Sequence, residues 1–339
     1  MHIWFTMGPK TDDDNMLRHA FAAGATGCRL TFSFGTQELQ LQRAQRLKHC
    51  AKAVSRECFV VADLAGEKIR LGNFETNNLQ IKSGAVITLV APKRKFCVEE
   101  LVLPVNSDSF FAGAEVGNNV ILGDGSAVLE VKTVLPGEIK TQALSDGVIN
   151  PNRGVVIQNQ HFNPSSLTDK DISDLKFIAQ SSAFDAVAIS FVSSAEDVIR
   201  ARNIINSVSG RQIPIIAKLE TKVGIENVNE IADTADFLMA ARGDLALFMP
   251  WTELPASVSK IQRAAKEKQK PWVLATQVVE GLERFEFPTR AEICDLAQWL
   301  TRGTSGIMLS YETAFGPKPI SAIMAVTSMT KRWDPARSY

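Results

Sequence analysis

The chain has 339 residues, with 37 lysines and arginines against 37 aspartates and glutamates, so its formal net charge is zero. At ~150 residues per domain, this length predicts roughly two domains, or one large barrel that carries an insertion. A hydrophobic content of 45% is enough for a sizeable core, and balanced charges at 22% argue against a disordered chain or a dedicated nucleic-acid binder.

The N-terminus and the cysteines indicate the compartment. The first residues lack the basic and apolar regions of a signal peptide, and no apolar run approaches the ~20 residues that a membrane span needs. The 5 cysteines are widely spaced and form no C-x-x-C pair, which argues against a zinc site or a disulfide framework. We expect a cytoplasmic protein with no membrane or nucleic-acid partner.

Short apolar runs alternate with longer amphipathic stretches along most of the chain. The predicted strands are Ile3–Thr6, Gly27–Leu30, Phe59–Asp63, Ala186–Phe191, Ile213–Leu219, Phe237–Ala241, Trp272–Thr276 and Gly306–Leu309. The predicted helices are Asn15–Ala23, Thr36–Val54, Asp169–Gln180, Ala195–Val208, Ile225–Asp233, Ala256–Glu267, Arg290–Thr301 and Ile320–Thr330. This alternation predicts an α/β fold, a TIM (β/α)8 barrel, with a doubly wound open sheet as the alternative.

Residues 71–153 interrupt this rhythm with short apolar runs that turn residues separate. The runs are Ala85–Val90, Val120–Leu122 and Ala127–Val131. They predict a small all-β module that enters after the third barrel strand and leaves before the fourth. We therefore assign residues 1–70 and 154–333 to the barrel, 71–153 to an inserted lid domain, and 334–339 to a C-terminal tail.

Polar residues stand at the carboxyl ends of most predicted strands, where TIM barrels carry their chemistry. They include Arg29, Asp63, Ser190, Lys218, Glu220, Asp244, Thr276, Ser310 and Glu312. Each short pattern has a plainer explanation, because Lys-x-Glu is often a surface ion pair, Arg-Gly-Asp a turn, and a lone Asp or Thr a helix cap. Their convergence at one end of the barrel is what favours a site.

The spacing of Lys218 and Glu220 places both side chains on one side of a strand. Glu220 and Asp244, from neighbouring strands, supply oxygen ligands for one hard divalent cation. Lys218 and Arg29 would neutralise an anionic substrate bound to that metal. A divalent cation with two such cationic side chains is typical of sites for phosphoryl transfer or enolate stabilisation. No Walker A pattern and no G-x-G-x-x-G is present, so neither of those loops would bind phosphate.

Blocks spread over nearly the whole chain resemble those of the pyruvate kinase family. They are Thr6–Pro9, Arg29–Thr36, Leu167–Ile172, Ile216–Glu220, Ala241–Leu245, Ala275–Gln277, Pro288–Glu292 and Met308–Ala314, in the family's order. The resemblance implies a TIM barrel with an inserted small β-barrel lid. It implies an enzyme that converts phosphoenolpyruvate and ADP to pyruvate and ATP.

The resemblance also implies a role for each matching residue. Lys218, Thr276 and Arg29 would be catalytic, with Lys218 stabilising the phosphoryl group in flight and Thr276 near the route that protonates the enolate. Phosphoenolpyruvate would be held by Arg29, Lys218, Gly243, Asp244 and Thr276. Mg²⁺ or Mn²⁺ would be held by Glu220 and Asp244, and the nucleotide by Arg70, Lys170, Thr31 and Ser33.

Some positions depart from the family's pattern. Lys68 stands where the family commonly has glutamate, as in members that do without potassium. Its ammonium would replace the monovalent cation near Ser33 and Asp63, so we expect no K⁺ requirement. Thr31, Phe34 and Ala65 weaken the match on the nucleotide side, and Tyr311 replaces a glycine and reshapes the mouth of the site.

Three functions stay open from the sequence. The first is the kinase. The second is a divergent enzyme that keeps the metal–enolate half of the site and uses another acceptor, and the third is a non-catalytic barrel-fold binding protein. We expect a short member that lacks the family's C-terminal regulatory domain, binds small molecules only, and forms a homo-oligomer through the barrel.

Overall fold

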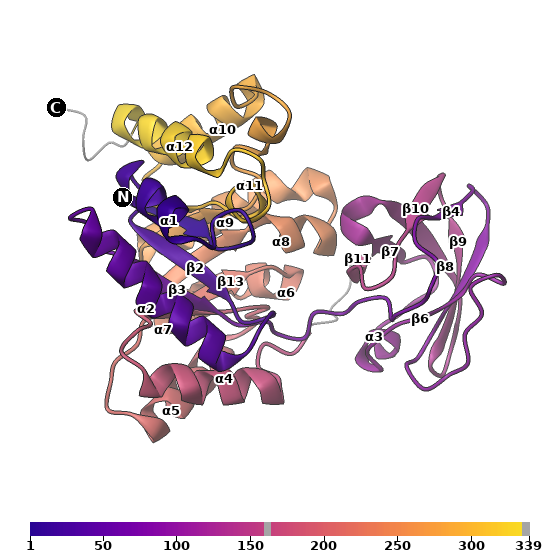
Figure 1. The fold of residues 1–339 in the computed structure, drawn as a ribbon. Coiled ribbons are helices and arrows are strands. Elements are labelled where there is room, and N and C mark those ends of the chain that lie inside the picture. Colours follow the sequence, from indigo (N-terminus) through magenta and orange to yellow (C-terminus); the bar gives the residue numbers. More distant parts are fainter. Residues whose placement is uncertain (159–163, 334–339) are drawn as a thin grey trace.

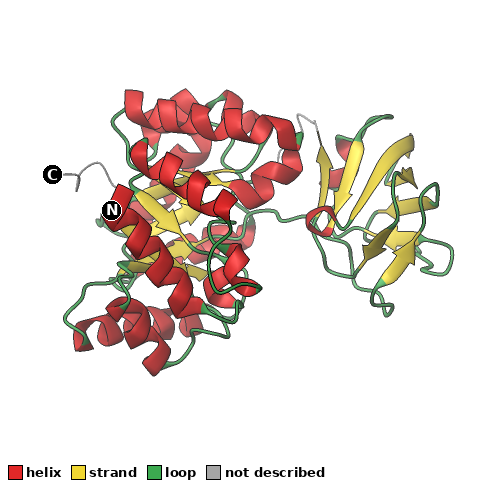
Figure 2. Ribbon diagram, turned by 90° about the horizontal axis from the view of Figure 1, so that it is seen from above, coloured by secondary structure: helices red, strands yellow, loops and turns green. Residues whose placement is uncertain are grey.

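The computed structural model describes residues 1–158 and 164–333, so the predicted tail at 334–339 lies outside the described residues. Eight parallel strands close into a barrel in the order β1-β16-β15-β14-β13-β12-β3-β2. Figure 2 shows the strands of the barrel surrounded by helices, with the second, strand-rich part of the chain to one side. The strands are β1 (His2–Thr6), β2 (Gly27–Thr31), β3 (Phe59–Asp63), β12 (Ala186–Ile189), β13 (Ile215–Leu219), β14 (Phe237–Ala241), β15 (Trp272–Ala275) and β16 (Gly306–Met308). The predicted TIM barrel is confirmed, and the open doubly wound sheet is excluded.

Helices cover the outside of this barrel (Figure 1). They are α1 (Asp14–Ala22), α2 (Gln37–Ala53), α4 (Asp169–Gln180), α5 (Ala195–Val208), α6 (Lys222–Glu226), α7 (Val228–Thr234), α8 (Arg242–Phe248), α9 (Leu254–Glu267), α10 (Arg290–Thr301), α11 (Tyr311–Ala314) and α12 (Pro319–Trp333). Capping boxes fix the starts of α4, α5 and α10. The short helix α8 follows β14 directly, and two residues separate α11 from the end of β16. Neither is predicted from the sequence, because so few residues show no helical periodicity.

The lumen of the barrel is filled at one end and open at the other. Near the amino ends of the strands, the rings of Trp4 and Phe59 stack with centroids 5.4 Å apart. Near the carboxyl ends, β14 and β15 finish in the small residues Ala241 and Ala275. The bulky side chains therefore make a floor, and the small ones leave room above it.

The inserted segment is an all-β module with its own hydrophobic core, and it stands apart from the barrel (Figure 1). Its elements are β4 (Leu79–Ile81), β5 (Val86–Val90), β6 (Val102–Pro104), α3 (Ser109–Ala112), β7 (Asn119–Leu122), the 3₁₀ turn η1 (Gly123–Gly125), β8 (Ala127–Leu135), β9 (Glu138–Ala143), β10 (Gly147–Ile149) and β11 (Val155–Gln158). The described strands form an open six-stranded sheet, β11-β7-β8-β9-β5-β6, and a two-stranded sheet, β10-β4. Closure into a small β-barrel is therefore not shown.

The module returns to the barrel beside α8. Strand β11 pairs with β7, so the sheet of the module continues past the predicted end at residue 153. Gln158 Nε2, at the end of β11, donates to the Met249 carbonyl 2.8 Å away, directly after α8. This contact holds the module near the carboxyl ends of the barrel strands. None of the described helices has the length and apolar character needed to cross a membrane.

Candidate active site

A pocket of about 520 Å³ lies at the carboxyl ends of the barrel strands. Its lining includes Arg29, Lys68, Lys218, Glu220, Gly243, Asp244, Thr276, Gln277, Glu280, Glu283, Ser310 and Tyr311. The structure thus brings together all of the predicted catalytic, phosphoenolpyruvate-binding and metal-binding residues.

Lys218, on β13, is buried at the bottom of this pocket. Its Nζ lies 2.6 Å from Ser190 Oγ, 3.1 Å from Glu220 Oε1 and 3.2 Å from Asp63 Oδ1. Burial alone would lower the pKa of Lys218, but the charges of Asp63 and Glu220 outweigh it and raise the pKa. Asp63 and Glu220 therefore favour the charged ammonium form of this buried lysine.

Asp63 is the counter-ion of two cations. The Nε of Arg29 donates to Asp63 Oδ2 at 2.6 Å, and the Nη2 of Arg29 also contacts this oxygen. Burial would raise the pKa of Asp63, but Arg29 and Lys218 hold it below its usual value. Asp63 lies behind the pocket and fixes the two cations that line it.

Glu220 and Asp244 bring two carboxylates to the same pocket. Glu220 Oε2 accepts a hydrogen bond of 2.9 Å from the backbone N–H of Phe191, whose φ of 55° is left-handed. Burial raises the pKa of Glu220; the charge of Lys218 opposes this rise and that of Asp244 adds to it. Both carboxylates line the same pocket. In the part of the chain that the structure describes, no cluster of three or more acidic, His or Cys residues suits a metal. Two carboxylates fit Mg²⁺, because this ion completes its shell with water and substrate oxygens.

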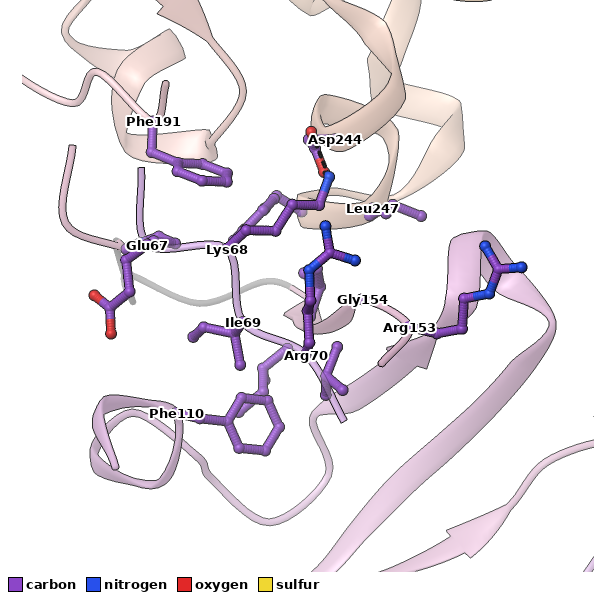
Figure 3. A pocket seen from close by; sticks show the side chains of 15 residues that line it. Glu67, Lys68, Ile69, Arg70, Phe110, Arg153, Gly154, Phe191, Asp244 and Leu247 are labelled. Atoms are coloured by element: carbon purple, nitrogen blue, oxygen red, sulfur yellow. Dashed lines mark hydrogen bonds and ion pairs between the residues drawn. The ribbon is translucent and has the colours of Figure 1, made fainter. Parts of the chain in front are cut away.

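Lys68 contacts the second of these carboxylates. Its Nζ lies 2.9 and 3.2 Å from the two oxygens of Asp244 (Figure 3). Burial would raise the pKa of Asp244, but Lys68 holds it below its usual value. Of the predicted monovalent-cation residues, Ser33 is exposed, and Asp63 pairs with Arg29 and Lys218.

The predicted nucleotide residues do not line the 520 Å³ pocket. Arg70 lines a smaller crevice of about 90 Å³ between barrel and module, together with Phe110 and Phe191 (Figure 3). Lys170 Nζ, on α4, bonds to the Phe32 carbonyl at 2.7 Å and to Asp174 Oδ2 at 2.5 Å. The carbonyl of Thr31 accepts from Gln40.

Three charged residues at the carboxyl end of the barrel had no role assigned from the sequence, although Glu312 was noted there as a polar residue after a strand. Arg242 is buried and holds backbone carbonyls at the end of β15. Glu312, also buried, accepts hydrogen bonds from the N–H groups of Val278, Val279 and Ser310. Glu280 lines the pocket, and burial together with neighbouring carboxylates raises its pKa to about 7. An available signal was that all three follow barrel strands.

Tyr311 also lines the pocket, as expected of a residue that reshapes its mouth. Its ring stacks on Phe315, with centroids 5.4 Å apart. The phenol therefore forms part of the rim on the β16 side.

Comparison with known proteins agrees with this arrangement. Residues 1–323 match the barrel domain of pyruvate kinase. The chain belongs to the pyruvate kinase family. A pyruvate kinase of Thermotoga maritima is 33% identical over 96% of this chain and 69% of its own length. That of Geobacillus stearothermophilus is 32% identical over 98% and 57%, and that of Clostridium perfringens 30% identical over 99% and 70%. The chain thus spans 57% to 70% of the lengths of these relatives.

Proposed function

We propose that the protein transfers the phosphoryl group of phosphoenolpyruvate to ADP, with Mg²⁺ or Mn²⁺, and releases pyruvate and ATP. The observation that carries the proposal is the buried Lys218 ammonium, in one pocket with Arg29, Glu220, Asp244 and Thr276. Family membership supports it independently. We also propose the cytoplasm as its compartment; the domain boundaries and an assembly through the barrel stay predictions.

The residues of the pocket divide the work of the reaction. Arg29 and Lys218, both held by Asp63, would bind the anionic substrate and neutralise charge as the phosphoryl group moves. Glu220 and Asp244 would hold the metal, which when bound supplies further charge neutralisation and orientation. The Thr276 hydroxyl would lie near the enolate carbon that takes up a proton.

A second function has an observation in its favour. The predicted nucleotide residues are spread over the crevice and α4, and Phe34 is 64% exposed. The residues that would bind a phosphoryl acceptor are therefore less clustered than those that would bind phosphoenolpyruvate and the metal. This favours a divergent enzyme that acts on the phosphoenolpyruvate or pyruvate enolate with another acceptor.

A coupled assay separates the two functions. Purified protein is given phosphoenolpyruvate, Mg²⁺ and a panel of nucleoside diphosphates, and pyruvate release is followed with lactate dehydrogenase. Turnover with ADP supports the kinase. No pyruvate with any nucleotide, alongside exchange of the pyruvate methyl protons with D₂O, overturns the kinase and supports the divergent enzyme.

We propose further that the reaction does not require K⁺. Lys68 already places a fixed positive charge in the pocket, 2.9 Å from Asp244. Rates in K⁺-free and Na⁺-free buffer should agree within about twofold with rates in added K⁺. The Lys68→Met variant, which lacks that charge, should respond to K⁺ more strongly. A strong K⁺ requirement in the unaltered protein would contradict the proposal.

A further inference from the structure

The end of β15 has an unusual backbone. Thr276 and Gln277 follow this strand with φ values of 70° and 53°, both in the left-handed region. Threonine is β-branched and disfavours this conformation, so the surrounding structure must hold it in place. Both residues line the pocket.

Arg242, the first residue of α8, holds that backbone. Its Nε and Nη2 donate to the Thr276 carbonyl at 3.1 and 2.8 Å, and Nη2 also donates to the Gln277 carbonyl at 2.8 Å. The remaining arm, Nη1, contacts Asp295 Oδ2 at 2.6 Å, and Trp299 Nε1 donates to the other oxygen of Asp295 at 2.7 Å. Both arms of the rigid guanidinium are therefore in use, an arrangement that a lysine does not reproduce.

The next two residues complete the arrangement. A Cβ on Gly243 would lie 2.9 Å from Thr276 Cγ2, so only glycine lets α8 approach the threonine this closely. Asp244 follows directly and lines the pocket beside Glu220. The tripeptide of residues 242–244 thus links the proposed metal carboxylate to the threonine at the end of the neighbouring strand, β15.

We propose that Arg242 is a positioning residue, which aims the Thr276 hydroxyl at the enolate carbon and sets its distance from the metal carboxylates. The inference rests on the proposed function. In the step concerned, a C–H bond forms at the terminal carbon of the enolate. The hydroxyl of Thr276 gives the proton and takes another from water, so no oxidant or reductant is needed.

The test uses the Arg242→Lys variant, which keeps a positive charge and loses the fork. Exchange of the pyruvate methyl protons with D₂O, followed by NMR, should fall at least tenfold, together with kcat. The KM for phosphoenolpyruvate and the Kd for Mn²⁺, measured by calorimetry without substrate, should stay within about threefold. Asp295→Asn, which leaves Arg242 in place, should show the same pattern with a loss of about threefold.

Arg211→Lys is the matched control. Arg211 also donates to two backbone carbonyls, those of Ser181 and Phe184, away from the pocket. Its substitution should leave exchange, kcat and Mn²⁺ binding unchanged. Unaltered proton exchange in folded Arg242→Lys overturns the inference. A parallel loss of exchange and of Mn²⁺ affinity also overturns it, because general damage to the pocket would then explain the result.

If the unaltered protein shows neither turnover nor proton exchange, the proposed function is refuted, but the role of Arg242 in holding the backbone is not. A second measurement then tests that role. Hydrogen–deuterium exchange of the backbone amides in residues 276–282 should be faster in Arg242→Lys than in the unaltered protein, and unchanged in Arg211→Lys. Equal protection in both variants would show that Arg242 does not hold this segment.

Discussion

The two sides of the pocket are built in different ways. On the β2–β3–β13 side, charged side chains hold one another, as Arg29, Asp63, Lys218 and Glu220 do. On the β15–β16 side, charged side chains hold the backbone, as Glu312 does for three N–H groups. Substitutions on the first side should therefore remove a charge that acts on the substrate. Substitutions on the second side should instead displace the backbone that follows β15 and β16.

The largest effect is expected from Lys218→Met, on the charged side. The substitution removes the ammonium that would stabilise the phosphoryl group, so kcat should fall by about 10²–10³-fold. It also leaves Asp63 and Glu220 short of a buried partner, which should cost about 3–5 kcal/mol of stability. Steady-state kinetics and urea unfolding measure the two effects.

Lys268→Met is the control for this experiment. Lys268 pairs with Asp233 on an exposed surface, so its removal should change stability by less than about 1 kcal/mol and leave kcat unchanged. Full activity of folded Lys218→Met would contradict the role of this ammonium.

A smaller effect is expected from Glu312→Gln, on the backbone-holding side. The amide retains one oxygen, but its NH₂ group faces N–H donors, so at least one buried hydrogen bond is lost. Stability should fall by about 1–3 kcal/mol in urea unfolding. Glu286→Gln, on an exposed side chain, should change nothing. Equal stability of Glu312→Gln and the unaltered protein would show that these bonds do not hold the loop.

The same contrast explains what could be predicted from the sequence. The barrel followed from the alternation of strands and helices, and Lys218 and Glu220 from their two-residue spacing on a strand, because side-chain direction in a strand is set by the backbone. Left-handed φ values at Thr276 and Gln277 have no such periodic signal. The partners of Arg242 could not be inferred either, since they lie 34 and 35 residues away and meet it only once β14 and β15 pair.

Lys68 shows how far the sequence predicts the charged side of the pocket. The sequence predicted its positive charge and its place near the site, but not its partner Asp244, which lies 176 residues away on α8. The open sheet of the module is a similar case. Short apolar runs predicted strands there, but the pairing that decides between an open and a closed sheet depends on long-range contacts.

The smallest expected effect is a pH dependence of stability caused by Glu280, which lines the pocket near the backbone-holding side. Glu280 is half-buried, and burial together with the charges of Glu312, Glu283 and Glu292 raises its pKa from 4.5 to about 7. Because the folded state binds this proton more tightly than the unfolded state, the protein should lose stability as pH rises from 4.5 to about 7. Above that range the full penalty of an ionised Glu280 is present.

Glu280→Gln removes this titration. Its stability relative to the unaltered protein should be about equal at pH 4.5 and should be higher by about 1 kcal/mol at pH 8, a value reduced for the solvent exposure of the side chain. Urea unfolding at the two pH values measures the difference. Glu283→Gln, whose pKa is raised in the same direction at a more exposed position, should show a smaller gain. A gain for Glu280→Gln that does not depend on pH would mean that lost repulsion among ionised carboxylates is not its cause.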